Sequence, residues 1–197
     1  MKKYLMRMTL ILCLIVPVSG FAGVPLNTVQ SHVDKVLDVL RDPSLKAEAA
    51  KKVKREKIRA IADKMFDFTE LSKRTLVKNW DRFNPAQQKE FVELFTTLLG
   101  DTYANRIMAY TDEKIVFTKE VALSETTVEV QSTIHRKSGD VPLNYRLFVK
   151  EGSWRVYDVV IEGVSLIANY RSQFREILAN KPPESLLESL RKKVGKA

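Results

Sequence analysis

The stretch from Trp154 to Phe174 changes its hydrophobic pattern at a single glycine, and this change constrains the fold more than any other feature of the chain. Between Val156 and Ile161, β-branched and aromatic residues dominate, as in a strand that is buried on both faces. After Gly163, apolar residues recur at steps of three and four, which is typical of a helix with one buried face. The sequence therefore predicts a strand, a tight turn and a helix that folds back onto the sheet.

The region before this segment has the period of two that is typical of an antiparallel sheet. In one of its strands Leu143, Tyr145 and Leu147 alternate with polar or charged neighbours, so one face of the sheet should be apolar. Short turns containing Gly139 and Gly152 indicate hairpin connections. We expect four strands, near residues 115–118, 126–136, 141–150 and 153–161.

Helical patterns occupy the chain before the sheet. An amphipathic helix over 26–40 should stop at Asp42-Pro43, and Asp67 has the spacing of an N-cap for a short helix. Asn84 should cap a longer helix that begins at Pro85 and runs to about Ala109. Because that helix is apolar over a wide arc, we expect it to be buried against more than one neighbour. The fold class is therefore α+β, with N-terminal helices on a four-stranded antiparallel sheet and a helix at the C-terminal end.

A nine-residue signature lies in the segment that changes pattern. Its spacing is W-x-V-Y-D-V-x-x-E-G-V-S, and Asn84-Pro85-Ala86-Gln87 opens the long helix upstream. This combination resembles the toluene-tolerance (MlaC) family of periplasmic phospholipid-binding proteins. The resemblance implies a cone-shaped fold of the nuclear-transport-factor type that encloses an apolar cavity, and a cargo that is either a phospholipid or a hopanoid. The residues that carry it are Trp154, Val156, Tyr157, Asp158, Val159, Glu162, Gly163, Val164 and Ser165.

The first residues have the features of a secretory signal peptide. Lys2, Lys3 and Arg7 precede an apolar run over residues 10–16 that is too short to span a bilayer, and small residues follow it up to Ala22. We expect cleavage near Ala22 and a periplasmic mature protein.

Cleavage there would divide the chain into a signal peptide, residues 1–22, and a single lipid-binding domain, residues 23–197. This length suits one domain with a substantial core. The one cysteine of the chain, Cys13, would leave with the signal peptide. The mature domain would then have neither a disulfide nor a thiol nucleophile, and packing alone would hold it together.

The positive charge of the chain, formally +9, is concentrated in one stretch. Eight Lys or Arg residues and three acidic residues lie between Lys46 and Lys64, in a helical pattern. In an exported protein this helix would meet anionic lipid head groups or an acidic partner protein, although a solvated helix face explains it equally well. A second basic helix follows Pro182-Pro183, and we expect it to be docked on the domain.

An enzyme remains an alternative. His32 and His135 have no sequence-local partners, so we predict neither a metal site nor a bound cofactor. Ser165 lacks the glycine pattern of a nucleophile elbow and is expected to cap a helix. The arrangement that keeps the alternative open is Asp158 with Tyr157, Tyr145 or Tyr103, because a carboxylate among tyrosines in such a cavity suits acid-base chemistry on a lipid or isoprenoid.

We favour the interpretation that the protein is a soluble periplasmic carrier without catalytic residues. The acyl chains of its lipid would lie between the long helix and the apolar sheet face. Arg146 and Arg171 are head-group candidates, because a guanidinium pairs well with a phosphate. Each apolar candidate also suits a structural core. The candidate lining residues are Phe91, Phe95, Leu98, Leu99, Tyr103, Val128, Val130, Leu143, Tyr145, Leu147, Val156 and Val160.

The family resemblance also implies partners. They would be an outer-membrane lipid-handling lipoprotein and an inner-membrane ABC transporter complex, with the carrier moving phospholipid between the two membranes as a monomer. Such a role would support the lipid asymmetry of the outer membrane.

Overall fold

The structure, a computed structural model, describes residues 23–110 and 113–195. The predicted signal peptide over residues 1–22, with Cys13, lies outside these residues. Within the described part, no helix combines the length and the apolar character needed to cross a membrane.

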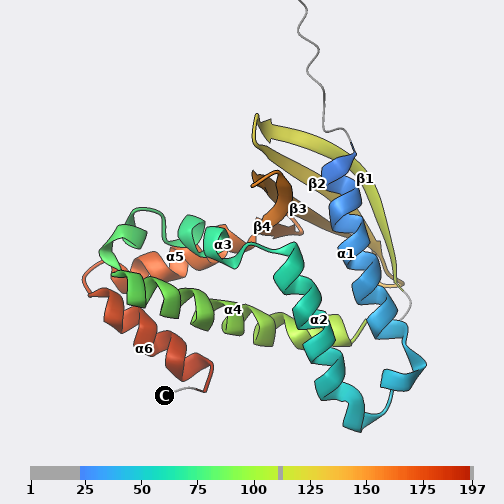
Figure 1. Cartoon of the computed structure of the whole chain (residues 1–197), viewed down its shortest axis with the longest axis horizontal. Helices are drawn as coiled ribbons and strands as arrows, with labels where there is room; N and C mark the ends of the chain where they lie inside the picture. Colours follow the sequence, from blue (N-terminus) through green and yellow to red (C-terminus); the bar gives the residue numbers. More distant parts are fainter. Residues whose placement is uncertain (1–22, 111–112, 196–197) are drawn as a thin grey trace, which may run out of the picture.

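The described chain forms two lobes (Figure 1). In the sheet lobe, helix α1 lies along a twisted antiparallel sheet and packs against α2. The short 3₁₀ turns Pro43–Leu45 and Glu48–Ala50 connect these two helices. The other lobe is almost entirely helical, with α4 packed against α3 and α6. The helices are α1 (Val24–Arg41), α2 (Lys51–Met65), α3 (Phe68–Leu76), the 3₁₀ helix η3 (Val77–Arg82), α4 (Pro85–Met108), α5 (Leu166–Leu178) and α6 (Pro183–Lys193).

The sheet has the strand order β1-β2-β3-β4-β5, with antiparallel neighbours throughout. The α+β class is confirmed, with one strand more than the sequence predicted. The additional strand β5 has only two residues, which is too short to produce a visible period of two. The strands are β1 (Lys114–Ser124), β2 (Thr127–His135), β3 (Val141–Lys150), β4 (Ser153–Ile161) and β5 (Val164–Ser165).

The predicted helix starts are confirmed, because they depend on local hydrogen bonds. Asn84 and Gln87 form a reciprocal capping box at the start of α4, and Pro85 occupies the first turn. The carboxylate of Asp67 accepts a hydrogen bond from the backbone N–H of Glu70 at the start of α3. The terminal helix α6 is docked as expected, with its leucines buried in the helical lobe.

Each lobe has its own hydrophobic core. We call the core of the helical lobe the helical cluster; its most deeply buried aromatic side chains are Phe91, Phe95 and Phe174. We call the core of the other lobe the sheet cluster. It combines the buried stripe of α1 with the apolar sheet face and Met65 at the end of α2. Its buried members are Val29, Val33, Leu37, Met65, Val130, Tyr145, Leu147, Trp154 and Val156.

The helix that covers the apolar sheet face is therefore α1, whereas we expected the long helix α4 there. The physical reason is the width of the apolar surface on each helix. The single stripe of α1, with Val29, Val33 and Leu37, matches one flat sheet face. The wide apolar arc of α4 is instead covered by other helices of its own lobe.

Candidate functional site

The signature segment forms a tight turn followed by a helix cap. Glu162 and Gly163 have φ values of 50° and 81°, so two consecutive residues adopt the left-handed conformation that tight hairpin turns require. Glycine at the second position takes this conformation without steric cost. The chain then pairs briefly as β5, and the hydroxyl of Ser165 accepts a hydrogen bond from the backbone N–H of Ala168, as predicted for a cap.

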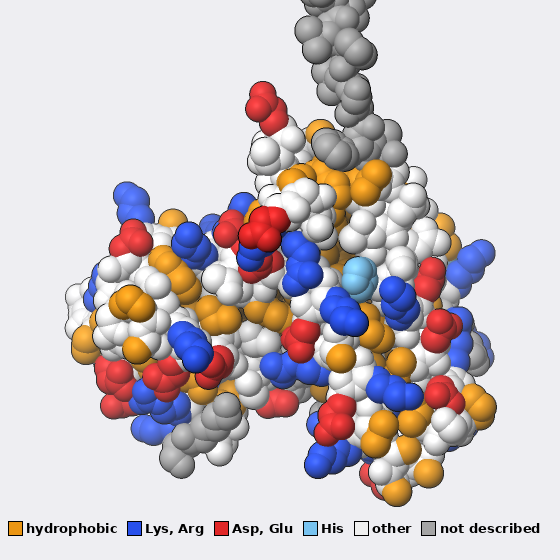
Figure 2. Space-filling view, viewed as in Figure 1, with side chains coloured by type: hydrophobic (Ala, Val, Ile, Leu, Met, Phe, Trp, Pro, Cys, Tyr) orange, Lys and Arg blue, Asp and Glu red, His pale blue; other side chains and the backbone are white. Residues whose placement is uncertain are grey.

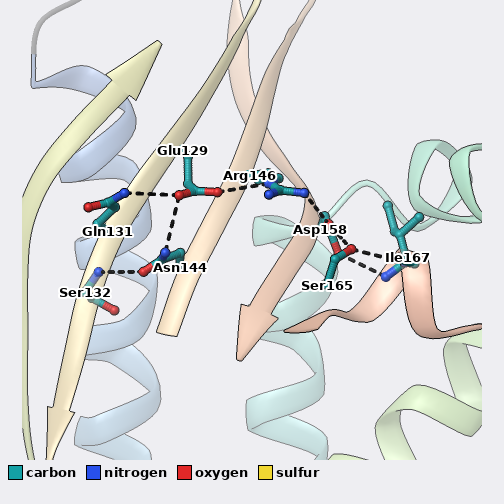
Figure 3. Close-up of polar contacts among 9 residues, drawn as sticks. Glu129, Gln131, Ser132, Asn144, Arg146, Asp158, Ser165 and Ile167 are labelled. Atoms are coloured by element: carbon teal, nitrogen blue, oxygen red, sulfur yellow. Dashed lines mark hydrogen bonds and ion pairs between the residues drawn. The ribbon is translucent and has the colours of Figure 1, made fainter. Parts of the chain in front are cut away.

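Asp158 is the polar centre of this segment, and only 2% of its surface is exposed. Its carboxylate accepts hydrogen bonds from Ser165 Oγ at 2.6 Å and from the backbone N–H of Ile167 at 3.1 Å (Figure 3). Since a negative charge is favourable at a helix N-terminus, Asp158 stabilises the start of α5. One buried carboxylate thus joins β4, the turn and α5, which explains physically why the signature combines these residue types.

Arg146 connects Asp158 to a second carboxylate. It lies opposite Glu129 on β2 and opposite Asp158 on β4, so the three side chains share one face of the sheet. Arg146 Nε lies 3.0 Å from Glu129 Oε2, and Arg146 Nη1 lies 3.4 Å from Asp158 Oδ2. The guanidinium, with a third of its side chain exposed, is therefore engaged by two acids in this structure.

Arg171, the other head-group candidate, lies on α5 at the surface of the helical lobe. Its guanidinium donates a hydrogen bond to the backbone carbonyl of Arg74 at 2.8 Å. It also borders a hollow of about 380 Å³ that is lined by residues 75–79, Phe174 and Arg175. The role of both arginines at a head group stays a prediction.

The structure divides the predicted lining residues between the two clusters. From α4, Phe91, Phe95 and Leu99 are buried in the helical cluster, while Leu98 and Tyr103 lie at its edge. The sheet residues lie in the other lobe, and Val160 is buried on β4. The lipid-binding role of all the predicted lining residues stays a prediction. In this structure, however, the residues of α4 and those of the sheet do not line one common cavity. The members in the sheet cluster are Val130, Tyr145, Leu147 and Val156, with Val128 and Leu143 partly buried against them.

The two clusters meet at Phe66, a residue that the sequence analysis missed. Phe66 packs against both clusters and stacks on Phe68 with ring centroids 5.4 Å apart. It lies between α2 and α3, where the backbone N–H of Asp67 donates to the carbonyl of Val156 on β4 at 2.9 Å. The sequence signal that could have identified this contact is the Phe-Asp-Phe sequence between two helical patterns. We call this contact region the seam.

Asp67 ties the seam to the sheet through an ion pair. Its carboxylate is buried and lies 2.6 Å from Lys150 Nζ on β3. Burial alone would raise the pKa of the Asp67 carboxyl. The hydrogen bonds from Lys150 and from the Glu70 backbone outweigh burial, so this pKa lies below its ordinary value. The helical lobe is therefore attached to the sheet by a charge as well as by apolar contact.

The tyrosines of the enzyme alternative are poorly suited to proton transfer near neutral pH. Burial raises the pKa of Tyr145 strongly, and it also raises the pKa of Tyr103 and of Tyr157. A catalytic acid or base works best with a pKa near the working pH. The carboxylate of Asp158 is hydrogen-bonded to Ser165 and the start of α5, as described above, so the structural interpretation of this aspartate is favoured.

The histidines have ordinary structural contacts. His32 Nδ1 lies 2.8 Å from the carbonyl oxygen of Thr28, and His135 Nδ1 lies 2.7 Å from the Asp140 carboxylate. Among the described residues, no group of His, Cys, Asp and Glu side chains has the arrangement of a metal site.

Comparison with known proteins agrees with the sequence resemblance. The family model described as MlaC protein matches residues 30–192, which is most of the chain. The chain therefore belongs to the MlaC family. It is also similar to the intermembrane phospholipid transport system binding protein MlaC of Haemophilus influenzae, with 26% identity over 109 residues. That match covers 53% of this chain and 51% of the relative, so it spans about half the length of that protein.

A solved structure has the same fold. It is the phospholipid-binding protein from Ralstonia solanacearum in complex with a phospholipid. The TM-score is 0.75 at 25% sequence identity, and the match covers 86% of this chain and 96% of that chain. The expected α+β architecture and the family resemblance are both confirmed.

Proposed function

We propose that this protein is a periplasmic lipid carrier that shuttles phospholipid between the outer and inner membranes as the binding component of an Mla-type ABC transport system. Membership of the MlaC family and the phospholipid bound to the similar Ralstonia protein support the cargo class. The observation within this chain that carries the proposal is the loosely closed sheet cluster. About as many of its members are partly buried as are buried.

The acyl chains would lie in the sheet cluster and reach the seam at Phe66. Several apolar side chains border this region without being fully buried, among them Phe117, Val128 and Leu143. Figure 2 shows apolar side chains that reach the surface between the two lobes and at the end of the sheet beside α1. Separation of the helical lobe from the sheet at the seam would open this apolar interior while α1 stays packed on the sheet.

The energetics suit a carrier better than a tight binder. Two chains of about 16 carbons gain about 0.8 kcal/mol per buried methylene, or about 25 kcal/mol in total relative to water. A bilayer offers nearly the same gain, so the net preference of the protein over the membrane is small. Because the free energies of the lipid in the protein and in the bilayer are nearly equal, the protein can take up lipid at one membrane and release it at the other.

The partners in this proposal are an outer-membrane lipid-handling lipoprotein and an inner-membrane ABC transporter complex. The protein would reach them after export and removal of a signal peptide near Ala22. The exposed basic side chains of α2, such as Lys52 and Lys57, offer positive charge for transient contacts with acidic partner surfaces or anionic head groups. Arg146 and Arg171 are proposed for the head group.

The test is the lipid content of the natively exported protein. After purification from a bacterial periplasm without detergent, denaturing extraction and mass spectrometry should find about one phospholipid per protein. A hopanoid in its place would keep the carrier and change the cargo. An extract with neither lipid would contradict the proposal.

A further inference from the structure

The N-terminal end of α1 is held by a side chain from β1, the first strand of the sheet. Glu120 lies on β1 and accepts two hydrogen bonds from the start of the helix. Its Oε2 lies 3.0 Å from the Gly23 nitrogen, and its Oε1 lies 2.6 Å from the Leu26 nitrogen. Both contacts are partly buried and join residues that are more than 90 positions apart in the sequence.

Helix α1 depends on this carboxylate because it lacks a cap of its own. Gly23 occupies the N-cap position and has no side chain, and the first turn contains no acidic residue. The first N–H groups of a helix have no partner within the helix, and its N-terminus favours negative charge. Glu120 supplies both the acceptor and the charge from the edge strand β1.

Gly23 also directly follows the predicted cleavage position. Gly20 and Ala22 are the small residues that a signal peptidase requires three and one positions before the cut. Hydrolysis of the Ala22-Gly23 bond consumes one water, leaves a carboxylate on Ala22 and gives Gly23 a free amine, which takes up a proton below its pKa. The nitrogen that now lies 3.0 Å from Glu120 would then carry a full positive charge and three hydrogens.

We propose that Glu120 is the receptor for the terminal ammonium that removal of the predicted signal peptide after Ala22 would create at Gly23. Processing would replace a hydrogen bond from a neutral amide to this carboxylate by an ion pair in which donor and acceptor both carry a full charge. It would thereby fix α1 across the sheet cluster, which α1 covers with Val29, Val33 and Leu37. The inference rests on the export step of the proposed function and is independent of the cargo.

The cleavage position is tested first. Protein exported with its own leader and recovered from the periplasm should begin at Gly23 by N-terminal sequencing and intact mass. A mature protein that begins at any other residue would overturn the proposal.

The ammonium contact is tested with two versions of the domain, prepared with a protease that leaves an N-terminal glycine. One begins at Gly23, and the other carries two further glycines, which place the ammonium up to about 7 Å along the chain. The version that begins at Gly23 should melt about 2 to 5 °C higher. Glu120→Gln should abolish this difference.

Glu125→Gln is the matched control, since Glu125 is an exposed acid in the β1-β2 connection and its replacement changes the net charge equally. It should preserve the difference between the two versions. Equal melting of the two versions, or a difference that survives in Glu120→Gln, would overturn the proposal.

Lipid content is measured on the same samples. A protein without lipid whose melting behaves as predicted would contradict the carrier function and leave this inference intact.

Discussion

The two lobes of this protein bury their apolar side chains to different degrees. Most members of the helical cluster are buried, and the rings of Phe91, Phe95 and Phe174 meet with centroids 5.1 to 5.6 Å apart. In the sheet cluster, partly buried side chains such as Phe117 and Val128 are about as numerous as buried ones. Dense aromatic packing resists rearrangement, whereas a loosely closed core can admit a guest. This difference supports our proposal that the sheet cluster receives the lipid while the helical cluster keeps its packing.

The largest predicted effect is a loss of stability when the helical cluster is disrupted. Phe95→Ala removes a ring with no exposed surface from the centre of the helical cluster. It should lower the free energy of unfolding by about 3 to 5 kcal/mol, because the surrounding helices can close the cavity only in part. Chemical denaturation measures the change. A loss of less than about 1 kcal/mol would show that the helical cluster is not closely packed around Phe95.

The second prediction compares equal enlargements in the two lobes. Leu147 of the sheet cluster and Leu187 of the helical cluster both have 0% exposure. Leu187→Trp should overpack a closed core and destabilise the protein by about 1 to 3 kcal/mol while lipid content is kept. Leu147→Trp should fill volume that an acyl chain needs, so lipid per protein should fall while the fold persists. Mass spectrometry beside thermal melting separates the outcomes, and the reverse pattern would exchange the roles of the lobes.

The third prediction concerns Asp158, to which we assign a structural role. Asp158→Asn removes the charge that Arg146, Ser165 and the start of α5 share, and it should cost about 1 to 3 kcal/mol of stability. Glu162→Gln is the control on the exposed turn, with an expected change within about 0.5 kcal/mol. Lipid content should be unchanged in both variants. Unchanged stability together with the loss of turnover on a lipid would instead support the enzyme alternative.

The smallest expected effect concerns the ion pair between Asp67 and Lys150, which links the helical lobe to the sheet. Because the folded-state pKa of Asp67 lies below its ordinary value of 3.8, its ionised form stabilises the fold above that pH, and this contribution is lost as the pH falls through the lower folded value. Lys150→Met removes the main partner and should cost at most about 1 kcal/mol near neutral pH. The gap between wild type and variant should narrow below about pH 4. A gap that is constant from pH 3 to 7 would contradict the ion-pair contribution.

Features that depend on neighbouring residues could be predicted from the sequence. The caps at Asn84, Asp67 and Ser165 and the turn at Gly163 each use groups within a few positions of one another. The alternation around Tyr145 likewise identified the apolar sheet face.

Pairings between distant segments could not be predicted in the same way. The wide apolar arc of α4 shows how much surface the helix buries but not which elements cover it, so the sequence alone places its apolar residues against the sheet face. Phe66 at the seam lies between two helical patterns and belongs to neither. Glu120 lies 97 positions from Gly23, and no local pattern links an acid on an edge strand to the start of a helix.

We propose that lipid occupies the sheet cluster and not the helical cluster. A matched pair of tyrosines tests it, since Tyr145 is 6% exposed in the first cluster and Tyr170 is 7% exposed in the second. Each is replaced in turn by a photo-crosslinking phenylalanine analogue in protein exported to the periplasm, and after irradiation intact mass reports covalent adducts with phospholipid. We expect an adduct at position 145 and none at position 170. An adduct at position 170 alone would contradict it.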